Sequence, residues 1–228
     1  MMAGAGTRIA KPSIGRLLAA ALVVFSACTA QAAERRLLPV DEAWKDPTLV
    51  TFRKKLLAAL KRRDVKYVVA RAARNIRLSF GGYAGRKTFS EWLKLKGMRE
   101  TYWRELEGVF SLGGVFTGKD TFCIPYVACI DVPGCPDCDP YEIVYVLGDN
   151  AKAYAAMNTK SPVVATLSYD VLNMDYSKEV IEGWMAVELP RGGVGYVTGP
   201  EFRSPLDYRA LLRKRKGVWQ IDVFVAGD

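Results

Sequence analysis

The chain has 228 residues, and its 33 lysines and arginines against 24 aspartates and glutamates give a net charge of +9 near neutral pH. It contains no histidine, which excludes a Ser-His or Cys-His nucleophile, a histidine-ligated zinc hydrolase and a histidine general base. The sequence has no phosphate-binding loop or dinucleotide fingerprint and no clustered basic patch, so we expect no cofactor and no nucleic-acid partner.

Residues 1–32 have the pattern of a secretory signal peptide. A basic leader precedes the apolar run Leu17–Ala27, which is too short to span a bilayer comfortably, and Ala30–Ala32 is a small-residue cleavage site. The leader holds three of the 33 basic residues and none of the 24 acidic ones, so the rest of the chain has a net charge of +6. We therefore expect an exported, periplasmic protein whose basic surface favours an anionic neighbour such as a cell-wall polymer.

A lipid anchor is the alternative to simple cleavage. The segment Phe25–Cys28 resembles a lipoprotein attachment site, although phenylalanine fits its first position poorly. A lipid on Cys28 is the only membrane attachment that we expect.

Residues 33–120 predict a helix-rich α+β region. Asp46 and Pro47 form a cap and first-turn pair, and Asp64 can cap a second helix that runs to about Ala73. The apolar stripe expected on the first helix comprises Leu49, Phe52, Leu56 and Leu60, with Arg53 among the charged residues on other faces.

After Ala73 the spacing of hydrophobic residues changes twice, first to that of a strand and then back to that of a helix. Ile76, Leu78 and Phe80 alternate with polar residues, which predicts a strand that ends at the following glycines. Thr88 and Glu91 are spaced as a capping box, which predicts that a helix begins there. A further helix carries aromatic residues at helical spacing and stops before Gly113 and Gly114; such aromatic residues usually form core. The aromatic and leucine residues expected in that core are Phe89, Trp92, Leu93, Trp103, Leu106 and Phe110.

A cysteine-rich loop is expected over residues 121–140. Its four cysteines are Cys123, Cys129, Cys135 and Cys138, and none remains elsewhere after cleavage. In an oxidising compartment they should form two disulfides. Three connectivities are open; proximity favours Cys123 with Cys129 and Cys135 with Cys138. A four-thiolate zinc site also fits the count, but export favours oxidation and we expect no metal. The Cys-Pro-Asp-Cys segment lies in a proline-rich loop and opens no helix, so we expect a loop staple and no redox role.

Residues 141–205 consist of short β-branched and aromatic runs broken by Gly, Pro, Asn and Asp, as in a small antiparallel barrel. In the strand Trp184–Leu189, alternation places Met185, Val187 and Leu189 on the core face. Trp184 then shares the opposite face with Glu188, where it either closes the rim of the barrel or forms a platform for a ligand.

These residues resemble the bacterial Src homology 3 (SH3b) family of cell-envelope barrels. The resemblance covers about 60 residues, in Ser161–Ser168, Gly183–Trp184, Val187–Pro190 and Gly195–Val197 leading to Phe202–Pro205. It implies an SH3-like barrel that binds a peptide or a peptidoglycan-like ligand. The chain departs from the family at Ala151–Met157, where Tyr154 stands in place of the family's arginine. We expect Trp184, Tyr196 and Tyr154 to contact the ligand.

The flanking segments faintly resemble another family, the nuclear-transport-factor-2-like cone fold. The segment Asp64–Gly85 resembles the start of that fold. Within the C-terminal β-hairpin expected over residues 206–228, Tyr208–Val225 resembles its closing hairpin, with a turn at Lys216–Gly217. In the hairpin, Trp219, Ile221 and Val223 alternate with Gln220, Asp222 and Phe224. The hairpin either extends the barrel or packs back on the first region. The predicted fold class is α+β.

Three functions remain open, and we expect the protein not to be an enzyme. Glu105, Glu107 and Asp120 are the acids nearest to aromatic residues, but no spacing marks a cleft, so we interpret them as surface charges. The leading hypothesis is a binding protein that holds a peptide or cell-wall stem. One alternative is a structural or assembly partner of another envelope protein. The other is a small-molecule-binding or weakly catalytic cone domain, which requires a polar-lined cavity among Phe80, Trp92 and Trp103.

Overall fold

The computed structural model describes residues 1, 4, 35–97 and 99–227. The predicted cleavage site and Cys28 lie outside the described residues. A 3₁₀ turn, η1 (Ala43–Lys45), precedes the helices, and the described part of the chain contains no helix long and apolar enough to cross a membrane.

The first two helices begin at the predicted caps. Helix α1 (Pro47–Lys61) follows Asp46, whose carboxylate accepts hydrogen bonds from the backbone N–H groups of Thr48 and Leu49 at 2.8 and 3.3 Å. Helix α2 (Val65–Arg71) follows Asp64, whose carboxylate accepts the N–H of Tyr67 at 2.9 Å. Each cap satisfies donors that have no partner within the helix.

The predicted capping box is wrong. Thr88 lies inside helix α3 (Gly85–Trp92), whose N-cap residue is Ala84 and makes no side-chain bond. The helix starts earlier because a turn fixes its entry: the Leu78 N–H donates to the Tyr83 carbonyl at 2.9 Å and Ala84 bridges to Arg77. Helix α4 (Arg99–Ser111) ends before the glycine pair, as predicted.

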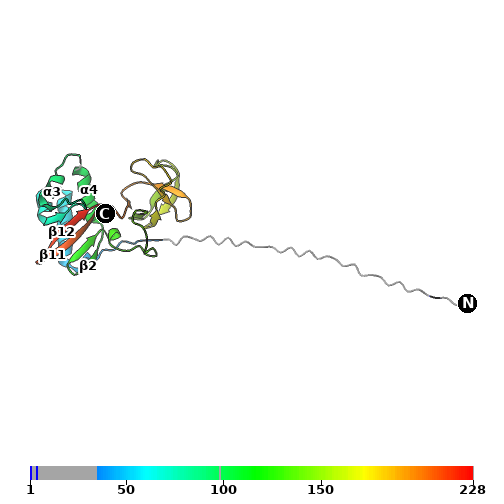
Figure 1. Cartoon of the computed structure of the whole chain (residues 1–228), viewed down its shortest axis with the longest axis horizontal. Helices are drawn as coiled ribbons and strands as arrows, with labels where there is room; N and C mark the ends of the chain where they lie inside the picture. The colour runs from blue at the N-terminus through cyan, green and yellow to red at the C-terminus, as the bar shows by residue number, and fades with distance from the viewer. Residues whose placement is uncertain (2–3, 5–34, 98, 228) are drawn as a thin grey trace. The chain divides into compact units, whose positions relative to one another are not determined.

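A five-stranded sheet combines three strands from residues 72–124 with two strands of the C-terminal hairpin. Its order is β1 (Ala72–Arg77), β12 (Val218–Val225), β11 (Arg209–Arg215), β3 (Thr121–Ile124) and β2 (Val115–Gly118). The β1 and β12 strands are parallel, and the other pairs are antiparallel. Figure 1 shows β2, β11 and β12 near α3 and α4. The C-terminal hairpin therefore packs back on the first region.

The hairpin has the predicted turn, but a bulge interrupts the regular alternation of its last strand. Lys216 and Gly217 have φ angles of 50° and 78°, as a two-residue hairpin turn with positive φ at both positions requires. Leu211 pairs with Val223 and Leu212 with Ile221, so Asp222 is an extra residue on its strand. Because such a bulge shifts the alternation of side chains, Phe224 is fully buried and Val223 only half-buried, so the alternation expected from the sequence breaks after Ile221.

Residues 141–205 form two small sheets, and the predicted closed barrel is not confirmed. One sheet has the order β10 (Phe202–Arg203), β4 (Ile143–Val146), β7 (Val171–Asn173), and the other β6 (Val163–Leu167), β5 (Ala151–Tyr154), β9 (Val194–Val197), β8 (Met185–Glu188). An isolated bridge joins Met174 to Val187. Backbone pairing between the two sheets does not extend beyond the Met174–Val187 bridge, so the strands do not close into a barrel. Both sheets contribute to one hydrophobic cluster, which includes Val144, Val146, Ala153, Leu172, Val187 and Val197.

A larger hydrophobic core lies among the helices and the five-stranded sheet. The aromatic residues expected in it are buried there, with Trp92 partly so. Trp103 is 1 % exposed, and its indole N–H donates to the Leu93 carbonyl at 3.1 Å. Arg53 is also buried, contrary to the prediction, because its guanidinium reaches the carboxylate of Asp41 and the carbonyl of Leu112 at the end of α4.

Candidate functional site

The three aromatic residues predicted to bind a ligand lie together on one sheet. Tyr154 of β5 pairs with Tyr196 of β9, and its ring meets the indole of Trp184 edge-on, with centroids 5.9 Å apart. All three are half-buried. We call these residues, Tyr154, Trp184 and Tyr196, the aromatic row.

The row continues across all four strands of the sheet. Val163 pairs with Tyr154, and Ala186 pairs with Tyr196. Residues directly opposite each other in a sheet point to the same face, so exposed Val163 continues the row onto β6. On the other face, Val187 is fully buried, and Met185 and Leu189 pack against the same hydrophobic cluster. The predicted core face of this strand is confirmed.

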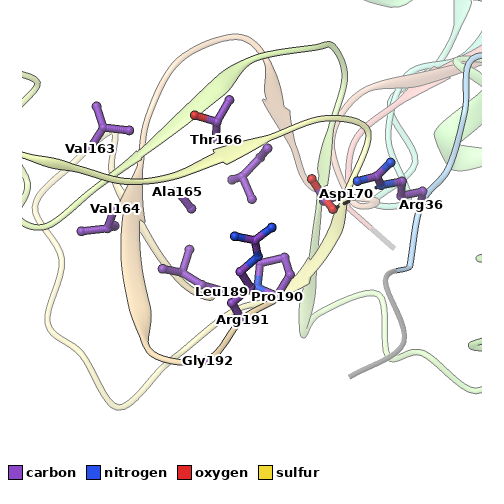
Figure 2. Close-up of a pocket in the computed structure, with 11 residues that line it drawn as sticks. Arg36, Val163, Val164, Ala165, Thr166, Asp170, Leu189, Pro190, Arg191 and Gly192 are labelled. Carbon is purple, nitrogen blue, oxygen red and sulfur yellow. Dashed lines mark ion pairs between the residues drawn. The ribbon is translucent and has the colours of Figure 1, made fainter. Parts of the chain in front are cut away.

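A groove of about 520 Å³ lies along β6 (Figure 2). One wall is β6 itself, and the other is the turn that joins β8 to β9. Its lining residues are Val163, Val164, Ala165, Thr166, Leu167, Leu189, Pro190, Arg191 and Gly192, with Arg36 and Asp170 at one end. This volume is typical of pockets that hold small ligands or short peptide segments.

The β6 wall is a strand edge. In the described part of the chain β6 pairs with β5 alone, so it forms the edge of its sheet. Val163 and Val164 are 47 % and 44 % exposed, and all five residues of β6 line the groove. An edge strand presents unpaired N–H and C=O groups on which another extended segment can add.

The opposite wall is a hydrogen-bonded turn that carries Arg191. The Gly192 N–H donates to the Leu189 carbonyl, and the Leu189 N–H donates to the Gly193 carbonyl, both at 2.9 Å. Pro190 suits the first central position of such a turn, and Gly192 and Gly193 supply φ angles of 89° and 85°. Figure 2 shows the guanidinium of Arg191 pointing from the turn toward β6.

The groove is cationic. Asp170 is buried, accepts the Ser168 N–H at 2.6 Å and forms an ion pair with Arg36 at 3.8 Å. Arg191 is exposed, and no carboxylate of residues 35–97 or 99–227 forms an ion pair with it. A guanidinium in this position can hold a carboxylate through two parallel hydrogen bonds.

The sequence alone did not identify the groove. Nothing close to Arg191 in sequence shows that β6 lies opposite it. The sequence from Pro190 to Gly193 does have the composition of a hairpin turn, and this signal could have placed Arg191 at a loop tip.

The four cysteines form two disulfides, Cys123–Cys129 and Cys135–Cys138, with Cα atoms 5.9 and 5.3 Å apart. This is the connectivity that proximity favoured. Among the described residues, no group of three or more Cys, Asp and Glu is placed to hold a metal ion.

The residues proposed to line a cone cavity have separate neighbours. Phe80 is 46 % exposed and lies against the guanidinium groups of Arg77 and Arg209. Trp92 instead contacts Tyr83 and Tyr102, and Trp103 is buried. These contacts give no support to a cavity among the three.

Comparison of the chain with protein-family models, with curated proteins and with solved structures found no match.

Proposed function

We propose that this chain is a non-enzymatic binding protein of the cell envelope that holds an extended peptide, such as the peptide stem of a cell-wall polymer. The observation that carries the proposal is the groove along the unpaired edge of β6, which faces the guanidinium of Arg191. Backbone groups of the strand would bind an extended peptide by β-augmentation, and Arg191 would bind a carboxylate on it.

The aromatic row supports the same assignment. Val163 lines the groove and also pairs with Tyr154, so the groove and the row adjoin at that residue. Half-buried aromatic rings supply a large contact area at low entropic cost. A peptide lying along β6 could therefore place a side chain or sugar against Tyr154 and Trp184.

The resemblance to SH3b proteins and the predicted leader favour a cell-envelope ligand. Peptidoglycan stem peptides are short, extended and rich in carboxylates, which matches a cationic groove beside a strand edge. The assignment to the periplasm rests on the predicted leader and agrees with the two disulfides.

The test is co-sedimentation with purified peptidoglycan sacculi. We expect Trp184→Ala and Arg191→Ala each to weaken binding by about tenfold or more, as loss of a central contact does. Trp44→Ala is the matched control for the indole because Trp44 is 73 % exposed on η1. Lys66→Ala on α2 is the matched control for the lost charge, and both controls should bind as the parent does.

A photo-crosslinker at position 184 in living cells decides between ligand classes. Adducts that contain glycan and peptide support the proposal. If the adducts are protein alone and the four variants sediment with sacculi alike, the proposal is wrong, and the assembly-partner hypothesis replaces it.

A further inference from the structure

The two disulfides have different surroundings. Cys123 lies in β3 inside the five-stranded sheet and is 7 % exposed, and the sulfur of Cys129 lies 2.9 Å from the carbonyl oxygen of Pro125. Cys129, Cys135 and Cys138 are each half-buried, so only the first disulfide has a buried cysteine, and exposed residues lie between and around Cys135 and Cys138. A thiol or dithiol in solution therefore has easier access to the second disulfide.

The guanidinium of Arg35 lies against the Cys135–Cys138 disulfide. The Nη1 atom of Arg35 is 3.4 Å from the sulfur of Cys135 and 3.2 Å from the sulfur of Cys138. Arg35 lies about one hundred residues before the two cysteines, so no local sequence motif predicts these contacts. The Cys-Pro-Asp-Cys segment opens no helix that could stabilise a thiolate, which is why its sequence predicts no redox role. A guanidinium, which remains protonated under physiological conditions, can do the same.

Arg35 is held in place by strand β7 and its neighbours. Its Nη2 donates to Asn173 Oδ1 at 2.6 Å, and its carbonyl accepts the Val171 N–H at 2.8 Å. The amide of Asn173 donates in turn to Glu188 at 2.9 Å. Both the backbone and the side chain of Arg35 are therefore positioned before any sulfur is reduced, as a preorganised charge should be.

The other charges and surfaces around the pair are also defined. On one side the cysteines pack against a hydrophobic cluster that includes Val132 and Ile143, and apolar surroundings alone would disfavour a thiolate. Asp137 is exposed between the two cysteines, and Asp139 accepts the N–H of Tyr141 within its own loop. The guanidinium of Arg35 is the charged group within hydrogen-bond distance of both sulfurs.

We propose that Cys135–Cys138 is a redox-active disulfide that accepts two electrons from a dithiol, with Arg35 stabilising the thiolates that form. A thiolate of the dithiol attacks one sulfur, the Cys135–Cys138 bond breaks, and a mixed disulfide forms while the other cysteine leaves as a thiolate beside Arg35. The second thiol of the donor then loses its proton and attacks the mixed disulfide. The donor leaves as a disulfide, and its two protons pass to the two cysteines or to solvent.

The Cys135–Cys138 disulfide closes a short loop, which favours a role in thiol–disulfide exchange over a role in stabilising the fold. The sequence separation is three for Cys135 and Cys138 and six for Cys123 and Cys129. Chain-entropy reasoning assigns the smaller stabilisation to the shorter loop. Reduction of the second pair should therefore leave the fold intact, whereas Cys123–Cys129 ties β3 to the loop that follows it.

The experiment equilibrates the purified protein, expressed from the full coding sequence, in glutathione buffers of increasing reducing strength. Alkylation and peptide mapping then report the two disulfides separately. We expect Cys135–Cys138 to be half-reduced at a ratio [GSH]²/[GSSG] at least tenfold below that needed for Cys123–Cys129. Arg35→Ala should raise the ratio for Cys135–Cys138 by about tenfold, and Arg35→Lys should retain most of the parent's behaviour.

Arg36→Ala is the matched control because Arg36 is the next residue and pairs with Asp170. It should leave the redox midpoint of Cys135–Cys138 unchanged. The proposal is wrong if the parent's two disulfides reduce together, or if Arg35→Ala and Arg36→Ala shift the midpoint alike. The comparison of the two disulfides in the parent needs no variant, so it stands even if Arg35→Ala does not fold.

Discussion

Asp46 connects the first helix to the last two strands. Its carboxylate caps α1, accepts a hydrogen bond from Lys214 on β11 at 2.7 Å, and lies 3.3 Å from the indole nitrogen of Trp219 on β12. Burial alone would raise its pKa, but the hydrogen bonds from Lys214, from Thr48 and from the helix backbone outweigh burial and hold the pKa well below its usual range. The ionised form of Asp46 therefore stabilises the folded state.

Replacement of Asp46 by asparagine should show this at neutral pH. Asparagine keeps the cap but loses the ion pair, so we expect Asp46→Asn to lower the free energy of unfolding by about 1–3 kcal/mol at pH 7. A carboxyl whose pKa is depressed on folding stabilises the protein above the pKa of the unfolded chain, and that contribution is lost as the pH falls further. The difference between parent and variant should therefore shrink by about 1.4 kcal/mol per pH unit below about pH 4.

Urea unfolding of parent and variant at pH 7 and at pH 3 measures this change. A difference that stays constant between the two pH values would contradict the role assigned to the carboxylate. Asp46→Ala adds the loss of the cap, so it should be less stable than Asp46→Asn at both pH values.

The glycine pair between α4 and β2 shows why an element boundary falls where it does. A Cβ atom on Gly114 would lie 2.3 Å from the carbonyl oxygen of Cys123, and one on Gly113 would lie 2.1 Å from the carbonyl oxygen of Val40. The Gly114 carbonyl accepts the Glu42 N–H at 2.8 Å. Two backbone segments thus pass this pair at distances that a side chain would prevent.

Alanine at Gly114 should destabilise the protein by about 1–3 kcal/mol or more, because backbone atoms must move to admit the methyl group. Gly108 is the matched site: it lies in α4, and a Cβ there would meet no atom within 4 Å. Gly108→Ala should stabilise the protein by up to about 1 kcal/mol through helix propensity. Thermal unfolding of both variants measures the contrast, and a Gly114→Ala variant as stable as the parent would contradict the close approach.

Element types were predictable where the signal is local. The caps at Asp46 and Asp64 depend on groups two or three residues away, so the sequence shows them directly. The Lys216–Gly217 turn is equally local. The start of α3 was not predictable from Thr88 because it depends on a turn that pairs Ala84 with Arg77.

Contacts between distant segments were not predictable. The bulge at Asp222 depends on its pairing with β11, which reverses the inward face of the strand after Ile221. In the candidate site, alternation predicted the shared face of Met185, Val187 and Leu189. The groove was missed because it depends on β6 lying at the edge of its sheet, opposite Arg191.

On the scale of the whole molecule, the five-stranded sheet depends on the C-terminal hairpin. In the described residues, β12 is the partner of β1, and β11 lies between β12 and β3. The hairpin also supplies buried core residues, among them Leu212, Trp219, Ile221 and Phe224.

A chain that ends after Leu206 should therefore not fold. Its β1 strand has no partner, β3 keeps only β2, and the apolar area lost is several side chains at about 1.5–3 kcal/mol each. A chain that ends after Val225 keeps every strand pair and is the control. Dispersion of amide resonances by NMR distinguishes the two, and a well-dispersed spectrum from the shorter chain would contradict the dependence.

The parallel pairing of Ala72 with Ile221 also has a consequence for biosynthesis. Ribosomes make the chain from its amino end, so β1 is complete long before its partner exists. Until β12 emerges, Ile76 and the apolar faces of the helices beside it have no finished sheet to cover them. The nascent polypeptide then exposes hydrophobic segments of the kind that chaperones bind, and native structure in this part can form only after β12 has been synthesised.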